Sequence, residues 1–346
     1  MMTVSVFNTE RIGDSMLALP AMRSFLAHYP GARSILVTDT STAPLYSASG
    51  MFSAVHHFRY RKASVPDMLR AAKVLSAEHI DVMMLMPGGF FAAFIAFFAH
   101  ARVRVGLASD MRGFLLTHRV RPRIDDRHRM HHFLDLLAPL GIPASELTPH
   151  INVPAGDILP RSPVPTIGIA PFTRDDPRRM YPLARWRALI ASIAGQKERI
   201  IIAGSKDEAV HYRAFLDEMV SAYGVVDAVG KYSLLDTARL LTQCDVVIAN
   251  DSGLMHLAAA AGTPTVALFG ATRSEKAGPL GDHTRVVASP SPCRPCDAKA
   301  RCTDVRCMDA IETHDVLAAM NELLERRDAV PNLSRKRNAT TENTEK

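Results

Sequence analysis

The chain has 346 residues, of which 47% are hydrophobic and 22% charged, and its formal net charge is +6 at pH 7. These proportions are typical of a globular protein and exclude a chain that is disordered throughout. The length exceeds what one hydrophobic core usually supports, so we expect two domains of about 150 residues each. The surplus of positive charge suits a partner that carries phosphate, or an anionic membrane surface, although it would also serve solubility alone.

Short apolar runs alternate with helical patterns along most of the chain, which is typical of parallel sheets covered by helices. The expected strands are residues 4–7, 34–38, 82–86, 166–170, 199–203, 246–249 and 265–269. A proline-rich stretch without periodicity, residues 153–166, is the expected linker between two α/β units. The polar stretch from about Asp328 onward is expected to be disordered.

The first residues, MMTVSVFNTERIGD, reach acidic and polar side chains too early for a signal peptide, so we expect a cytoplasmic location. Residues 82–99 are uncharged for about the length that crosses a bilayer. However, the sequence Pro87-Gly88-Gly89 divides this segment into a strand-like run and a helix-like run. We therefore favour a strand, turn and helix over a membrane span.

The stretch VVIANDSGLMHLAAAAG, residues 246–262, is an apolar run interrupted by polar residues. Ligands bind beyond the carboxyl ends of buried parallel strands, which is where these polar residues fall. The helix expected to begin near Gly253 presents unpaired N–H groups that suit phosphate, with the Ser252 hydroxyl and His256 close by. The alternative is that Asp251 or Ser252 only caps the helix and that His256 is a histidine at the edge of the core.

A second strand, turn and helix stands at the N-terminus, where Gly13 and Asp14 fall in the loop ahead of the helix. A carboxylate there would face any cleft between two domains. By local rules alone, an aspartate in that place is more often a helix cap than a catalytic group. The chain contains neither GxGxxG nor the Walker phosphate loop, so no common nucleotide motif competes with these two sites.

The two loops stand in a longer series of segments that occur in a specific order. They are LPAMRSFLAHYPGA, RVRVGL, RGFLLTHRV, HHFLDLLAPLGIP, APFTRDDPRRMYPLARWRALI, IIAGSKDE, VGKYSLLDTARLLTQCDVVIANDSGLMHLAAAAGTPTVALFGAT and CRPCDAKARCTDVRCMDAI. Together they resemble glycosyltransferase family 9, the heptosyltransferases of lipopolysaccharide core assembly. The similarity covers nearly the whole chain.

The resemblance implies an α/β fold of the GT-B type, in which two Rossmann-like domains face each other across a central cleft. Residues 1–155 would bind the acceptor, residues 156–327 would bind the nucleotide-sugar donor, and residues 328–346 would form a disordered tail. It also implies an inverting, metal-independent enzyme that moves a heptose or similar sugar, with ADP-heptose as the expected donor, to a lipopolysaccharide core. The chain has no Asp-x-Asp pair to hold a cation on a diphosphate, so positive charge must come from protein.

The resemblance also assigns residues to roles. Asp14 matches the family's catalytic base, with Gly13 in the acceptor-side loop. The implied donor-binding residues are Thr173, Arg179, Glu208, Asp251, Ser252, Gly253 and His256. Without the family, Glu208 would be interpreted as a solvated residue at a helix start and Arg179 as a surface charge. Asp251 is expected to cap the helix or bind a sugar hydroxyl, because a carboxylate would repel a diphosphate.

Two departures from the family pattern are residues 8–12, where small hydroxyl residues are common, and Tyr181, where tryptophan is common. Both are expected to border the acceptor or donor pocket, which leaves the identity of the sugar open.

Four of the five cysteines lie close together, namely Cys293, Cys296, Cys302 and Cys307. This spacing suits a four-thiolate zinc or iron site, although reduced thiols are the plainer interpretation and disulfides are disfavoured in the cytoplasm. Cys244 is expected to be a small buried hydrophobic residue. The implied reaction requires no cofactor besides its nucleotide-sugar substrate.

Basic stretches such as HRVRPRIDDRHRMHH lie mainly in the N-terminal half or near the domain junction. They form either a solvated surface or a contact with a phosphorylated, lipid-linked acceptor and the anionic inner leaflet. No nucleic-acid motif accompanies them.

Two alternatives to the heptosyltransferase interpretation stay open, namely the same fold with another donor or acceptor and a non-catalytic protein that binds nucleotide sugars.

Overall fold

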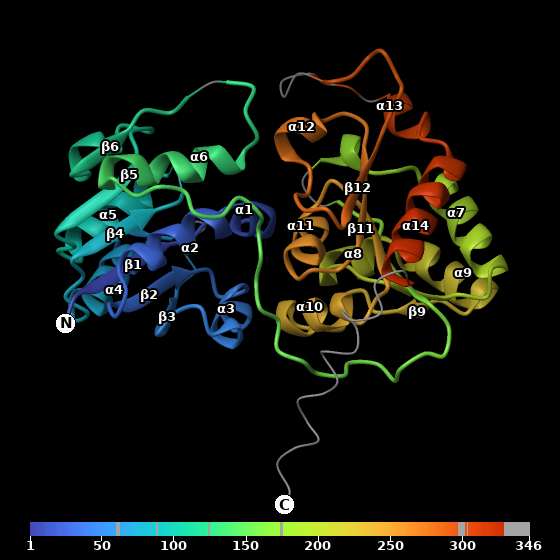
Figure 1. Cartoon of the computed structure of the whole chain (residues 1–346), viewed down its shortest axis with the longest axis horizontal. Coiled ribbons are helices and arrows are strands. Elements are labelled where there is room, and N and C mark those ends of the chain that lie inside the picture. Colours follow the sequence, from blue (N-terminus) through green and yellow to red (C-terminus); the bar gives the residue numbers. More distant parts are fainter. Residues whose placement is uncertain are drawn as a thin grey trace, which may run out of the picture.

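The computed structural model describes residues 1–59, 63–87, 89–123, 125–173, 176–296, 302 and 304–328. The chain forms two lobes, each built around a parallel sheet of six strands (Figure 1). These helix-covered parallel sheets confirm the predicted α/β class. The prediction of a disordered tail concerns residues beyond Asp328, which lie outside the described residues.

The N-terminal lobe holds the first sheet, with the strand order β3-β2-β1-β4-β5-β6. Its strands are β1 (Thr3–Phe7), β2 (Arg33–Thr38), β3 (Ala54–His57), β4 (Val82–Leu85), β5 (Val103–Leu107) and β6 (His118–Val120). Its helices are α1 (Ile12–Leu17), α2 (Leu19–His28), α3 (Ala43–Ser49), α4 (Val65–Ser76), α5 (Phe90–Phe98), η1 (Arg112–Leu115), α6 (Met130–Leu134) and η2 (Asp135–Leu140). The order reverses between β1 and β4, which is the point where Rossmann-like sheets bind ligands.

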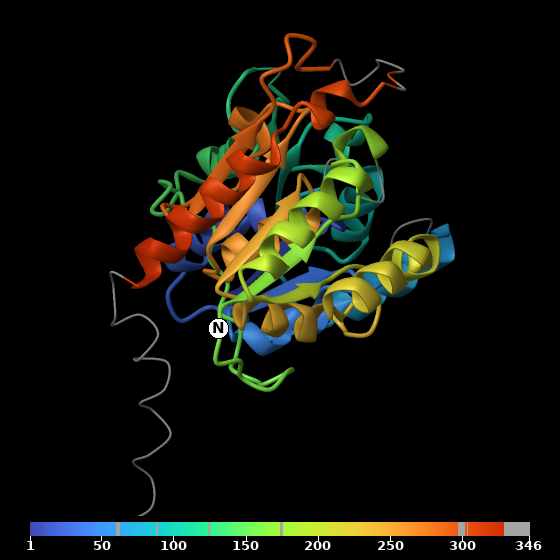
Figure 2. The same ribbon diagram turned by 90° about the vertical axis from the view of Figure 1, so that its right-hand side faces the viewer.

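The C-terminal lobe repeats this topology, with the order β12-β11-β10-β7-β8-β9. Its strands are β7 (Thr166–Ala170), β8 (Arg199–Ile202), β9 (Val226–Asp227), β10 (Val246–Asn250), β11 (Thr265–Phe269) and β12 (Thr284–Ala288). Its helices are η3 (Pro177–Arg179), α7 (Leu183–Gly195), α8 (Lys206–His211), α9 (Arg213–Tyr223), α10 (Leu234–Thr242), α11 (Gly253–Ala260), α12 (Ser274–Ala277), α13 (Arg306–Asp309) and α14 (Thr313–Asp328). Figure 2 shows α7 and α14 packed on one face of this sheet. The order reverses between β7 and β10.

Every strand predicted from the sequence is present. β7 and β11 have the predicted bounds, and the other five differ by one residue at one end. Five further strands, β3, β5, β6, β9 and β12, were not predicted. Residues 82–99 contain β4 and α5, which confirms the expected strand and helix. Among the described residues, no helix combines the length and apolar character that a bilayer crossing requires.

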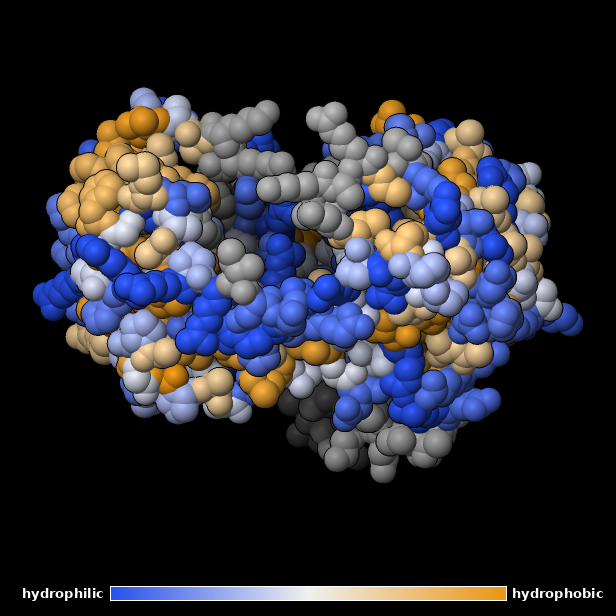
Figure 3. All heavy atoms as spheres, turned by 90° about the horizontal axis from the view of Figure 1, so that it is seen from above, coloured by the Kyte–Doolittle hydropathy of each residue, from blue (hydrophilic) through white to orange (hydrophobic). Residues whose placement is uncertain are grey.

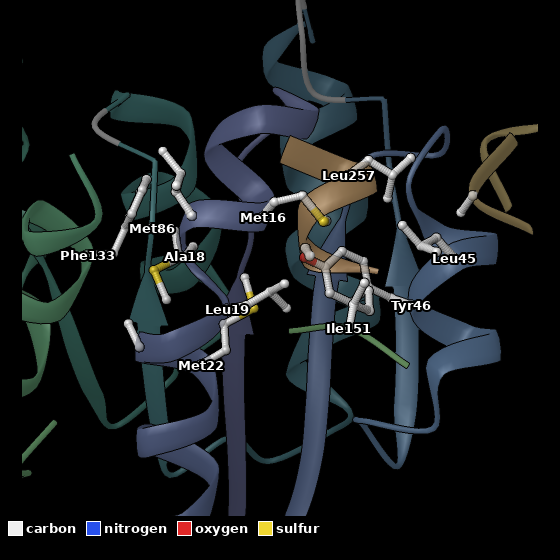
Figure 4. Close-up of a cluster of buried hydrophobic side chains, with 14 of the residues drawn as sticks. Met16, Ala18, Leu19, Met22, Leu45, Tyr46, Met86, Phe133, Ile151 and Leu257 are labelled. Atoms are coloured by element: carbon white, nitrogen blue, oxygen red, sulfur yellow. The ribbon is translucent and has the colours of Figure 1, made fainter. Parts of the chain in front are cut away.

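The lobes meet through buried side chains. Met16 of α1, Tyr46 of α3 and Leu257 of α11 belong to one hydrophobic cluster that continues from one lobe into the other (Figure 4). Helix α11 lies against β10 and β11 of its own lobe and against α1 of the other. A helix covered on several sides needs apolar residues all round, which explains its sequence GLMHLAAA.

Candidate active site between the lobes

Asp14 lies at the reversal point of the first sheet. Gly13 and Asp14 belong to the first turn of α1 rather than to the loop before it, which corrects the expected position. The residue that precedes the helix is Arg11, and no side chain caps the helix, so the interpretation of Asp14 as a cap is wrong. The Asp14 side chain is 17% exposed, and its Oδ1 atom lies 3.2 Å from Nη1 of Arg129.

A buried hydrogen-bond network anchors the start of α1. The Asn8 amide donates to Ser15 Oγ at 2.8 Å and to Thr38 Oγ1 at 3.1 Å. Ser15 Oγ also lies 2.6 Å from the Tyr46 hydroxyl, and burial raises the pKa of Tyr46 to about 12, so this phenol stays protonated. Because Asn8 is fully buried, it supports α1 and does not border a pocket, contrary to expectation.

The second half of the site is the N-terminus of α11, which follows β10 directly. Ser252 precedes the helix and makes no capping hydrogen bond. Its Oγ atom is buried and has no hydrogen-bond partner among the described residues. Asp251 instead accepts a hydrogen bond from Thr272 Oγ1 at 2.9 Å and lies 3.4 Å from Arg179 Nη1. In the described part of the chain, neither side chain accepts a hydrogen bond from the first N–H groups of the helix, so these donors have no capping partner there.

Arg179 places a cation beside this helix N-terminus. Its Nη1 atom donates to the Asp251 carbonyl at 3.3 Å, and its buried Nε atom has no hydrogen-bond partner among the described residues. The side chain is 23% exposed and is therefore not an ordinary surface charge. Thr173 Oγ1 donates to the Asp176 carbonyl at 2.9 Å, which ties together the loop that carries Arg179.

Two glycines allow the two halves of the site to touch. A methyl group at Gly13 would lie 3.0 Å from Cδ2 of His256, and one at Gly253 would lie 3.0 Å from Cβ of Ile12. Both distances are at the lower limit for such contacts, so larger residues would push α1 and α11 apart. The glycines therefore bring the helix that carries Asp14 against the open end of α11. Figure 3 shows hydrophilic side chains in the hollow between the lobes.

His256 lies at this contact and is 7% exposed. Burial, with the nearby charges of His128, Arg129 and Arg179, lowers the pKa of His256 to about 3. The ring is therefore neutral near pH 7 and has a single N–H to donate. It supplies no positive charge to a bound anion.

This lowered pKa predicts how stability depends on pH. Unfolded His256 takes up a proton below about pH 6.5, whereas the folded form does not until about pH 3, so stability present above pH 6.5 is lost as the pH falls. Replacing His256 with glutamine should remove this loss. We expect the difference in unfolding free energy between the two proteins to shrink by up to about 1.4 kcal/mol per pH unit below 6.5. Urea unfolding of both proteins at several pH values measures this difference. A difference in unfolding free energy that does not change with pH would contradict a neutral His256 in the folded protein.

Two further expected site residues have structural contacts. Glu208 forms a capping box at α8, in which its Oε2 accepts from the Ser205 N–H at 2.7 Å. A role of Glu208 toward a ribose stays a prediction. Tyr181 does not border a pocket, contrary to expectation, because it is fully buried, packs edge-on against Trp186 and donates to the Ile311 carbonyl at 2.9 Å.

The cysteine cluster gives no support to a metal site. Cys293 is exposed, Cys296 and Cys302 are partly buried, and Cys307 is buried. In the part of the chain that the structure describes, no three His, Cys, Asp or Glu side chains are arranged to hold a metal ion. Cys244 is buried and burial raises the pKa of its thiol to about 12, as expected for a small core residue.

The sequence interpretation missed the segment that joins the lobes beside Asp14. The Arg129 N–H donates to the Lys276 carbonyl at 2.8 Å, and His128 Nε2 lies 3.0 Å from the Gly278 carbonyl. Asp126 pairs with Arg273 at 3.0 Å and with Lys276 at 2.6 Å. A pocket of about 460 Å³ opens here, lined by Asp126, Arg273, Glu275, Lys276, Arg294 and Pro295. The only sequence signal was the basic character of this stretch.

Two Rossmann-like lobes with their reversal points turned toward one cleft define the GT-B class of glycosyltransferases. The sequence model of "Glycosyltransferase family 9 (heptosyltransferase)" matches residues 68–304, more than half of the chain. The chain belongs to this family, and the resemblance inferred from its motifs is confirmed. It is a glycosyltransferase of the heptosyltransferase type.

The relatives agree with this assignment. Lipooligosaccharide heptosyltransferase 2 of Haemophilus influenzae is 25% identical over 317 residues, covering 83% of this chain and 88% of the relative. The solved ADP-heptose lipopolysaccharide heptosyltransferase II of E. coli has a TM-score of 0.79 and 22% identity, covering 94% of this chain and 100% of that one. The E. coli heptosyltransferase WaaC with ADP-2-deoxy-2-fluoro heptose has a TM-score of 0.72 and 20% identity, covering 93% and 99%.

Proposed function

We propose that the protein transfers a heptose from ADP-heptose to a lipopolysaccharide core acceptor, with inversion of the anomeric carbon and without a metal ion. Residues 1–155 would hold the acceptor and residues 156–327 the donor. The transfer would take place in the cytoplasm, at the inner membrane. The proposal depends on one observation, the contact of α1 with α11 at Gly13 and Gly253, which brings the first turn of α1, the turn that carries Asp14, against the first turn of α11.

Asp14 would act as the general base. An acceptor hydroxyl must lose its proton as its oxygen attacks the anomeric carbon of the donor, and a positioned carboxylate can accept that proton. The pair with Arg129, at 3.2 Å, holds the Asp14 side chain in one orientation. Attack from the Asp14 side, with the diphosphate leaving toward α11, would form one bond as the other breaks and so invert the anomeric centre.

The leaving diphosphate would be stabilised by protein groups of the C-terminal lobe. The first N–H groups of α11 carry a partial positive charge, and the guanidinium of Arg179, which also pairs with Asp251, lies at the same place. The unpartnered Ser252 hydroxyl is free to donate to a phosphate oxygen. Charge that grows during the reaction is stabilised best by groups already fixed in position, which makes a metal ion unnecessary for this step. The E. coli relative that was solved with an ADP-heptose analogue supports ADP-heptose as the donor.

A thermal-shift panel tests the donor. A ligand that binds only the folded protein raises the midpoint of thermal unfolding, so ADP and ADP-heptose should each raise it. UDP- and GDP-sugars should leave it unchanged, with free adenosine as a control for the contribution of the base. If UDP- or GDP-sugars alone stabilise the protein, the donor assignment is wrong, and another glycosyltransferase activity on the same fold is favoured.

A further inference from the structure

The N-terminal lobe carries an exposed aromatic face away from the candidate active site. Phe90, Phe97 and Phe98 of α5 are 40%, 41% and 42% exposed, and Phe114 of η1 is 68% exposed. Beside Phe114, Met111 is 91% exposed. These four phenylalanines are the exposed ones among the fourteen in the chain, all of which are described. Their concentration on α5 and η1 therefore sets this face apart from scattered surface hydrophobic residues.

The rings form one continuous surface. The ring centroids of Phe114 and Phe90 lie 6.4 Å apart, those of Phe90 and Phe94 6.0 Å, and those of Phe94 and Phe98 4.5 Å. Phe97 completes the row at 5.4 Å from Phe98. Figure 3 shows hydrophobic side chains gathered on the outer part of this lobe. We call Phe90, Phe94, Phe97, Phe98, Met111 and Phe114 the aromatic face.

Basic side chains border the aromatic face. The Arg104 guanidinium lies over the Phe97 ring, 5.3 Å from its centroid. Arg119 is exposed, and its Cδ and Nε atoms lie 4.0 Å from where a Cβ at Gly113, the neighbour of Phe114, would stand. Arg121 and Arg123 follow and are exposed. Between Phe90 and Arg123 the sequence has six arginines, one of them the buried Arg112, no lysine, and a single acidic residue, Asp110.

We propose that the aromatic face docks the protein on an anionic phospholipid bilayer. Apolar rings that enter the boundary between headgroups and acyl chains lose contact with water, while arginines around them meet the lipid phosphates. A second copy of this chain fits less well, because a symmetric contact would bring the same arginines together. The inference rests on the proposed membrane location and names the surface that provides it.

Vesicle co-sedimentation of the full-length protein tests this docking. Vesicles of phosphatidylethanolamine and phosphatidylglycerol should bind the protein, and phosphatidylcholine vesicles should bind it much more weakly. The double variant Met111→Asn/Phe114→Ser should weaken binding at least about tenfold, from the lost apolar burial. Arg119→Gln, Arg121→Gln and Arg123→Gln should each weaken it on the order of fivefold at low salt. Asparagine suits position 111 because Met111 has φ 55°.

The matched control is Val210→Ser, because Val210 is 82% exposed on α8 of the other lobe and should not affect binding. Equal binding of the parent and the double variant, or equal binding to neutral vesicles, overturns the proposal. The proposal is also overturned if the parent protein is a dimer and the double variant is a monomer that binds vesicles as well as the parent does. The assay contains no donor or acceptor, so its failure leaves the transferase proposal standing, and loss of transferase activity leaves the docking result standing.

Discussion

Replacing Asp14 with asparagine is expected to lower turnover about a hundredfold to ten-thousandfold, because the amide cannot take the proton of the acceptor hydroxyl. Asparagine keeps the size of the side chain and its place in the first turn of α1. Donor binding should be unchanged, since the groups that would hold the diphosphate come from the other lobe. Steady-state kinetics and donor titration on the same preparation measure the two effects separately.

Stability should change little in this variant. The ion pair of Asp14 with Arg129 is half-exposed on the arginine side, so its loss is expected to cost less than about 1 kcal/mol. Asp217→Asn is a matched control, because Asp217 also pairs with an arginine, Arg213, at 3.0 Å but lies on the surface of α9. Full activity of the Asp14 variant would refute the assignment of the base. Loss of donor binding with proportionate loss of turnover would indicate a structural role instead.

Much of the fold was predictable because buried parallel strands leave a clear sequence pattern. β7, β10 and β11 are buried throughout, and each contains an apolar run with a polar residue only at one end. The strands that were missed are short or only partly buried, such as β12 at the sheet edge. β5 was missed because Arg104 interrupts the run VRVGL, and this arginine is accommodated by the carbonyls of Ala101 and Leu115.

The candidate site was predictable where one local motif carries it and not where distant segments meet. The sequence ANDSG after an apolar run indicates an open helix N-terminus, and the structure has α11 beginning at Gly253 as expected. Arg129 could not be found in this way, because its contact with Asp14 joins residues that are far apart in the chain. The pattern Ser-x-x-Glu at 205–208 did carry a local signal for a capping box, which the structure contains.

Replacing Arg179 with methionine is expected to weaken binding of ADP and of the donor about tenfold to a hundredfold, since a charge-assisted hydrogen bond contributes about 1.5–3 kcal/mol. Turnover should fall as well, because the negative charge on the leaving diphosphate grows in the transition state. Free adenosine lacks the phosphates, so its affinity should be unchanged. Isothermal titration with ADP and adenosine, followed by kinetics at saturating donor, separates these contributions.

Two comparisons make the Arg179 result specific. Arg185→Met removes an arginine of the same lobe that pairs with Asp309 and Glu312 on the surface, and it should leave ADP binding unchanged. Ser252→Ala should weaken ADP binding only about fivefold without lowering stability, because the buried hydroxyl has no hydrogen-bond partner among the described residues and no stabilising bond is lost with it. Arg179→Lys should recover part of the affinity, since it restores the charge without the planar guanidinium. If ADP binds the Arg179→Met variant as tightly as the parent, the diphosphate does not lie at the N-terminus of α11, and Asp14 would then face no leaving group there.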